Sequence, residues 1–108
     1  VARFGMDGEC VHFNGHIDVV EAGPGWTTDP FAATVKDGRI YGRGTCDMKG
    51  FLAVALAKLP RMVRKPLKSP VHFALSYDEE VGCFGAHGLA DHILSRGARP
   101  KLCIVGEP

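Results

Sequence analysis

The chain has 108 residues, of which 45% are hydrophobic and 23% charged, values that fit one globular domain. Its 13 basic and 12 acidic residues give a formal net charge of +1, so it lacks the overall basic excess of nucleic-acid-binding proteins. The longest apolar run, residues 51–57, is far shorter than the ~20 residues that cross a bilayer, and no signal peptide is recognisable. We therefore expect neither a nucleic-acid partner nor a membrane. The abrupt ends suggest a piece of a longer protein.

The four cysteines do not indicate a redox or structural zinc motif. Cys10, Cys46, Cys83 and Cys103 are widely spaced and form no C-x-x-C pair. Because three of them lie in or beside apolar runs, we expect reduced, buried side chains in a cytoplasmic protein.

The first predicted element is a strand within residues 9–20. Val11, Phe13 and Ile17 share one parity, whereas His12 and His16 share the other. This period of two predicts a strand with one apolar and one polar face.

A hairpin and a helix are predicted next. Two short apolar runs, residues 32–35 and 39–41, flank Lys36-Asp37-Gly38, and Asp-Gly between such runs is typical of a hairpin. A helix is expected from about Met48 to Leu59, with Asp47 as its N-cap and Pro60 as its end. The helix is so rich in apolar residues that we expect it to be deeply buried.

The remaining pattern indicates an α/β fold. Residues 71–76 form a short apolar strand, apolar residues recur at helical spacing from Ala86 to Leu94, and residues 102–105 form a third core strand. The order of these elements predicts a mixed or mostly parallel sheet with helices packed on its faces.

Acidic residues follow each of the three strands. Asp18 comes after the first strand, Asp78-Glu79-Glu80 after the second and Glu107 after the third, while Asp47 precedes the helix. If the strands are parallel, these carboxylates meet at one edge of the sheet and repel one another, which a divalent cation would relieve. The alternative is that they are separate, solvated loop residues.

His16 favours the metal site. In a strand, His16 and Asp18 point to the same face, and a carboxylate commonly holds the second ring nitrogen of a metal-bound histidine. His12 lies on this face too, but four residues of strand place it about 13 Å away. For the four other histidines, His12, His72, His87 and His92, we expect structural roles.

Other catalytic motifs are weak or missing. The chain has no complete dinucleotide fingerprint, no P-loop and no G-x-S-x-G elbow. Cys83 and His87 form a loose nucleophile–base pair, but helix packing explains their positions better.

Five blocks follow one another along the chain: G-H-I-D-V-V, W-T-T-D-P-F, D-G-R-I-Y-G-R-G-T-C-D-M-K-G, S-Y-D-E-E-V-G and G-E-P. Together they resemble the co-catalytic dizinc deacylase and peptidase family, which includes acetylornithine deacetylase, succinyl-diaminopimelate desuccinylase, aminoacylase and carboxypeptidase G. The third and fourth blocks look most like acetylornithine deacetylase. The resemblance implies a partial metallohydrolase catalytic domain over residues 1–108, with the lid or dimerisation domain and a second histidine ligand absent.

The resemblance also implies a set of metal ligands. His16 and Glu107 would bind one ion, Glu80 the other, and Asp47 would bridge the two. The peptide bond after Asp47 is often cis in the family. The ions are expected to be zinc, with cobalt or manganese possible.

Two further carboxylates receive roles from the resemblance. Glu79 would be the general base, and Asp18 would orient His16 from behind. Adjacent Glu79 and Glu80 can divide the duties of base and ligand because neighbouring side chains point in different directions.

The expected function is metal-dependent hydrolysis of an N-acyl amino acid, foremost N-acetylornithine in arginine biosynthesis, by a cytoplasmic homodimer. The alternatives are succinyl-diaminopimelate desuccinylase or another aminoacylase or carboxypeptidase of the family, and a non-catalytic module that retains the fold. A 108-residue chain without the lid is expected to be inactive alone.

Overall fold

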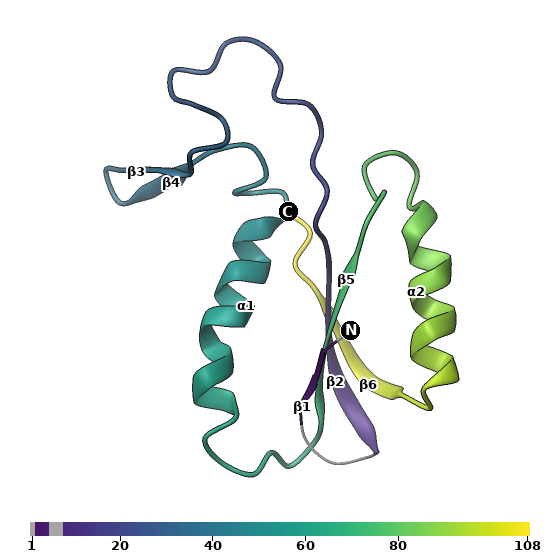
Figure 1. The fold of residues 1–108 in the computed structure, drawn as a ribbon. Helices are drawn as coiled ribbons and strands as arrows, with labels where there is room; N and C mark the ends of the chain where they lie inside the picture. Colours follow the sequence, from purple (N-terminus) through teal and green to yellow (C-terminus); the bar gives the residue numbers. More distant parts are fainter. Residues whose placement is uncertain (1, 5–7) are drawn as a thin grey trace.

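The computed structural model describes residues 2–4 and 8–108, and its centre is a four-stranded sheet (Figure 1). Its strands are β1 (Ala2–Phe4), β2 (Glu9–His16), β5 (Val71–Ser76) and β6 (Arg99–Val105), in the order β1-β5-β2-β6. β2 runs parallel to both β5 and β6, whereas β1 pairs antiparallel with β5. The predicted mixed, mostly parallel sheet is thus confirmed.

Two helices lie on opposite sides of this sheet. Figure 1 shows α1 (Lys49–Met62) on one side and α2 (Phe84–Ser95) on the other. A parallel pair needs a long crossover, and α1 supplies it between β2 and β5 while α2 supplies it between β5 and β6. No helix among the described residues combines the length and the apolar character needed to span a membrane.

Both faces of β2 are covered, including the face predicted to be polar. On the α1 side, Phe13 stacks on Phe73 at 5.2 Å between ring centroids and lies 6.3 Å from Phe51. On the other side His12 is only 3% exposed. The strand also ends at His16, so residues 17–20, predicted as strand, are irregular.

The predicted caps of α1 are both wrong. Met48 occupies the N-cap position without a side-chain hydrogen bond, because the Asp47 carboxylate instead faces His16. Pro60 lies inside the helix, which continues to Met62. Because proline has no N–H, Pro60 leaves out one helical hydrogen bond, the one to the carbonyl of Leu56.

The helix α1 is also less buried than predicted. Leu52 and Ala55 are buried against the sheet, but Val54 remains 61% exposed. Only one stripe of a helix on the surface of a sheet contacts that sheet, and in the described part of the chain the opposite side of α1 is open to solvent.

The other predicted elements are present, some of them with shifted boundaries, and β1 is an additional strand that the sequence did not predict. The hairpin consists of β3 (Thr34–Lys36) and β4 (Arg39–Tyr41), with Asp37 and Gly38 both at positive φ in the turn. β6 begins at Arg99, three residues earlier than predicted. Its pairing with β2 skips Lys101 and resumes at Leu102. Such a bulge interrupts the alternation that defines a strand in sequence.

The cysteine prediction holds in one respect only. All four cysteines are free, as expected, but Cys10 alone is buried. Cys46, Cys83 and Cys103 are exposed, because each lies in a loop, at a helix start or on the edge strand.

Candidate metal centre

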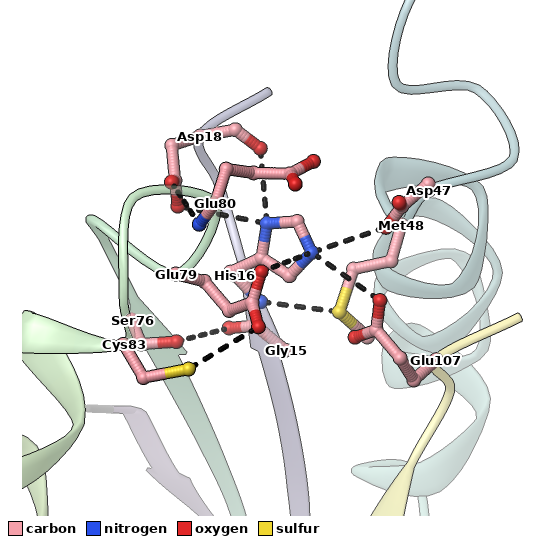
Figure 2. A network of polar contacts seen from close by, with 10 residues as sticks. All are labelled: Gly15, His16, Asp18, Asp47, Met48, Ser76, Glu79, Glu80, Cys83 and Glu107. Atoms are coloured by element: carbon pink, nitrogen blue, oxygen red, sulfur yellow. Dashed lines mark hydrogen bonds and ion pairs between the residues drawn. The ribbon is translucent and has the colours of Figure 1, made fainter. Parts of the chain in front are cut away.

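The topology gathers one histidine and five carboxylates at one edge of the sheet (Figure 2). Three parallel strands end there, and α1 begins there. The residues brought together are the six that the sequence singled out: His16, Asp18, Asp47, Glu79, Glu80 and Glu107. The carboxyl edge of a parallel sheet is the usual place for a ligand in an open α/β fold.

His16 is the buried centre of the cluster, with 1% of its surface exposed. Its Nδ1 lies 3.0 Å from the Asp18 carbonyl oxygen and 3.5 Å from Asp18 Oδ1. These acceptors assign a proton to Nδ1, which then donates to the Asp18 carbonyl. The other ring nitrogen, Nε2, is therefore the atom available for a ligand.

Carboxylates surround His16 Nε2. Asp47 Oδ1 lies 3.1 Å from this nitrogen, Glu107 Oε1 3.7 Å and Glu79 Oε2 3.8 Å. Ligand atoms of His16, Asp47 and Glu80 all lie within 4.8 Å of one another. One imidazole and several carboxylates make a donor set that suits zinc and similar divalent ions.

The charges of the cluster are unbalanced without a cation. Burial raises the pKa of Glu107, and a hydrogen bond and the negative charge of Asp47 raise it further. Burial would lower the pKa of His16, but its hydrogen bonds to Asp18 and Asp47, together with the nearby negative charges of Glu107 and Glu79, outweigh burial and raise it. Both shifts show the cluster recruiting protons, as carboxylates do when they face one another.

Asp18 is held from behind by the loop that follows β5. The backbone N–H of Glu80 donates to Asp18 Oδ2 at 3.1 Å. Burial would raise the pKa of Asp18, but backbone hydrogen bonds from residues 79–80 and its own N–H lower it, so the carboxylate stays ionised. Asp18 Oδ1 is buried and has no hydrogen bond, which leaves it facing His16.

The site also contains residues that the sequence did not single out. Met48 Sδ accepts the backbone N–H of His16 at 3.2 Å, and the Asp47–Met48 peptide bond is cis, as the resemblance suggested. Met48 also packs against Gly15, where a Cβ would come within 2.8 Å of its Cε. The D-M-K-G and G-H-I-D blocks contain both residues, but their contact joins positions distant in sequence.

Cys83 is the other residue whose place the sequence did not predict. Its Sγ lies 3.3 Å from Glu79 Oε1. A cavity of about 300 Å³ is lined by His16, Glu79, Cys83 and Glu107, among others. From sequence, Cys83 had suggested only a nucleophile.

The remaining histidines lie away from the cluster. His12 on β2 and His72 on β5 are buried, with their ring centroids 6.1 Å apart. His87 and His92 are exposed on α2. None of the four belongs to the group of potential metal ligands found among the described residues.

Comparisons with known proteins agree with this geometry. The family model described as Peptidase family M20/M25/M40 matches residues 12–108. The chain is 41% identical over 109 residues to succinyl-diaminopimelate desuccinylase of Gluconobacter oxydans, covering 99% of this chain and 29% of that protein. It is 43% identical over 113 residues to the enzyme of the same name from Methylobacterium radiotolerans, with 99% and 29% covered.

A solved structure gives the same result for the fold. The crystal structure of human carnosine dipeptidase 1 superposes with a TM-score of 0.80 at 28% identity, covering 98% of this chain and 24% of that chain. The chain thus spans less than a third of the length of each of these relatives. These two curated relatives carry the desuccinylase name, not that of acetylornithine deacetylase.

Proposed function

Because this chain belongs to peptidase family M20/M25/M40, we propose that it supplies metal ligands and the general base of an amide hydrolase acting on N-acyl amino acids. The observation that carries the proposal is the convergence of His16, Asp47 and Glu80, whose ligand atoms lie within 4.8 Å of one another. A buried imidazole beside this many carboxylates is costly to fold unless a cation binds there.

Four side chains would hold two divalent ions. His16 and Glu107 would bind one ion, Glu80 the other, and Asp47 would lie between them. Zinc ions held there would polarise a water molecule and the substrate carbonyl. Asp18 keeps Nε2 of His16 available by accepting the Nδ1 proton at its backbone carbonyl, 3.0 Å away.

Glu79 would accept the proton of the attacking water. Its Oε2 lies 3.8 Å from His16 Nε2, and Glu79 is not a member of the group formed by His16, Asp47 and Glu80. A general base must reach the water and yet remain free of the metal, and a place beside the ligand group suits that role. The proton would then pass from Glu79 to the leaving amine.

The proposed substrate is an N-succinyl amino acid of the diaminopimelate type. This choice rests on the names of the curated relatives, which are at least 40% identical to the chain. The N-acetylornithine alternative rests on the likeness of the third and fourth sequence blocks. These two candidate substrates differ in the acyl group. A succinyl group carries a carboxylate that an acetyl group lacks, and the enzyme would have to bind it.

Hydrolysis of N-succinyl-diaminopimelate and of N-acetylornithine by the zinc-loaded enzyme that contains this chain tests the proposal. We expect release of succinate with the larger kcat/KM, and no turnover in Asp47→Asn. Preference for the acetyl substrate would replace the proposed substrate. No turnover of either, with zinc bound, would favour a non-catalytic module.

A further inference from the structure

The carboxylate of Glu79 has its two oxygens in different surroundings. Oε1 lies 3.3 Å from the Sγ of Cys83, while Oε2 is the oxygen that faces His16 Nε2. Among the side chains that the structure describes, it is Cys83 that donates a hydrogen bond to the Glu79 carboxylate. Figure 2 shows the thiol on the side of Glu79 away from Asp47.

The backbone fixes where this thiol lies. Cys83 has φ 58°, in the left-handed region, and its N–H donates to the Glu79 carbonyl at 3.0 Å. It is the N-cap residue of α2, so the helix holds it in place. A residue with a Cβ is uncommon in this conformation, which makes the turn a specific one.

We propose that Cys83 is a positioning residue for Glu79, holding Oε1 so that Oε2 stays turned toward the metal centre. This inference rests on the proposed role of Glu79 as the general base. A glutamate side chain has several rotatable bonds, and Glu79 is about one-third exposed, so one fixed oxygen removes much of its freedom. Productive proton transfer depends on such orientation.

The thiol remains a donor in this position. Its hydrogen bond to Glu79 raises the pKa of Cys83, and burial and the nearby negative charges raise it further. The sulfur therefore keeps its proton at neutral pH and donates it to the carboxylate. This also makes Cys83 a poor nucleophile, since the thiolate is the reactive form.

The contact itself is tested by alkylation with iodoacetamide in the metal-free enzyme that contains this chain. Labelling of each cysteine is followed by mass spectrometry in the wild type and in Glu79→Gln. We expect Cys83 to react about threefold faster or more in the variant, because its neighbour has lost the negative charge. Cys103, exposed on β6, serves as the internal control. An unchanged rate at Cys83 would overturn the contact.

The consequence for catalysis is tested by three variants of the zinc-loaded enzyme. Cys83→Ala should lower kcat about threefold to tenfold, with KM and zinc content unchanged, which is the usual worth of one hydrogen bond. Cys83→Ser should restore kcat to within about twofold, since a hydroxyl also donates. Cys103→Ala should equal the wild type.

The outcomes separate the two proposals. Wild-type kcat in Cys83→Ala, or an equal loss in the serine and alanine variants, would overturn the positioning role. An enzyme that hydrolyses neither substrate counts against the proposed function instead, while the alkylation comparison still decides whether Cys83 contacts Glu79.

Discussion

Glu79 and Glu80 are neighbours in sequence, yet the loop after β5 presents them differently. Glu80 joins His16 and Asp47 in the group of potential ligands, whereas Glu79 has one oxygen on Cys83 and one toward His16. The backbone N–H of Glu80 donates to Asp18, which ties this loop to the segment that follows β2.

Glu79→Gln should lower kcat by about 10²-fold or more while zinc content stays unchanged, because an amide cannot accept the proton. Steady-state kinetics and metal analysis of the same preparations check this. Glu9→Gln is the matched control, since Glu9 is exposed and forms a surface ion pair with Lys101, 3.2 Å away on β6. Activity near the wild-type value in Glu79→Gln would mean that another group is the base.

His12 gives the fold a dependence on pH. Burial lowers the pKa of His12, and the charge of His72 lowers it further. The unfolded chain therefore binds a proton more readily, so this contribution to stability is present above the unfolded pKa, 6.5, and is lost as pH falls below it. His16 acts in the opposite direction, because its pKa is raised.

His12→Gln should flatten the fall in unfolding free energy between about pH 7.5 and about pH 5, because glutamine does not titrate in this range. Urea unfolding at a series of pH values, followed by far-UV circular dichroism, measures the two slopes. The contribution of His16 is common to both proteins and cancels in the comparison. Equal slopes would show that His12 is not the group responsible.

At the scale of elements, the end of β6 lies directly against the start of α1. A Cβ on Gly106 would overlap the ring of Phe51, in the first turn of α1. The absence of a side chain at Gly106 therefore lets the backbone after β6 lie against Phe51, which places Glu107 in the site.

Gly106→Ala should destabilise the fold by about 1–3 kcal/mol, because the added methyl group forces Phe51 or the strand end to move. Gly88→Ala is the matched control, since this glycine lies within α2 and a Cβ added there would meet no atom beyond its own helix within 4 Å. It should gain about 0.5–1 kcal/mol from helix propensity. Chemical denaturation of both variants provides the comparison, and equal effects would contradict the proposed packing.

Elements with a clean local pattern could be predicted closely from sequence. Residues 71–76 form β5 as expected, and the apolar spacing from Ala86 to Leu94 falls within α2. Errors occur where a distant contact overrides a local preference. Asp47 is a good N-cap residue in isolation, but in the fold its carboxylate faces His16. The burial of His12 depends on a helix more than seventy residues later in the chain.

The same holds for the site as a whole. Acidic residues at strand ends leave both a metal site and separate, solvated residues open, and the family resemblance selects the six residues that the structure brings together. Which oxygen faces which atom is a different matter, because it depends on turns such as the one at Cys83. Sequence spacing does not specify the φ of a non-glycine residue.

Metal binding should be coupled to the stability of the whole molecule, since the four proposed ligands come from separate segments. Zinc at about one hundred times its dissociation constant should stabilise the folded chain by about 2.7 kcal/mol. Thermal unfolding with zinc and with excess chelator measures this shift. Asp47→Asn should remove most of it, and an equal shift in that variant would point to the exposed cysteines.

The position of β2 in the sheet has a kinetic consequence. β2 precedes both of its partner strands, β5 and β6, in the sequence. Val11 of β2 pairs with Val71 on one side and with Leu102 on the other. The backbone ladder of β2 cannot close until β5 and β6 have both been synthesised, and long-range parallel pairing is slow. During synthesis on the ribosome, an apolar strand thus waits with both edges unpaired, which is when chaperone binding or aggregation would compete with folding.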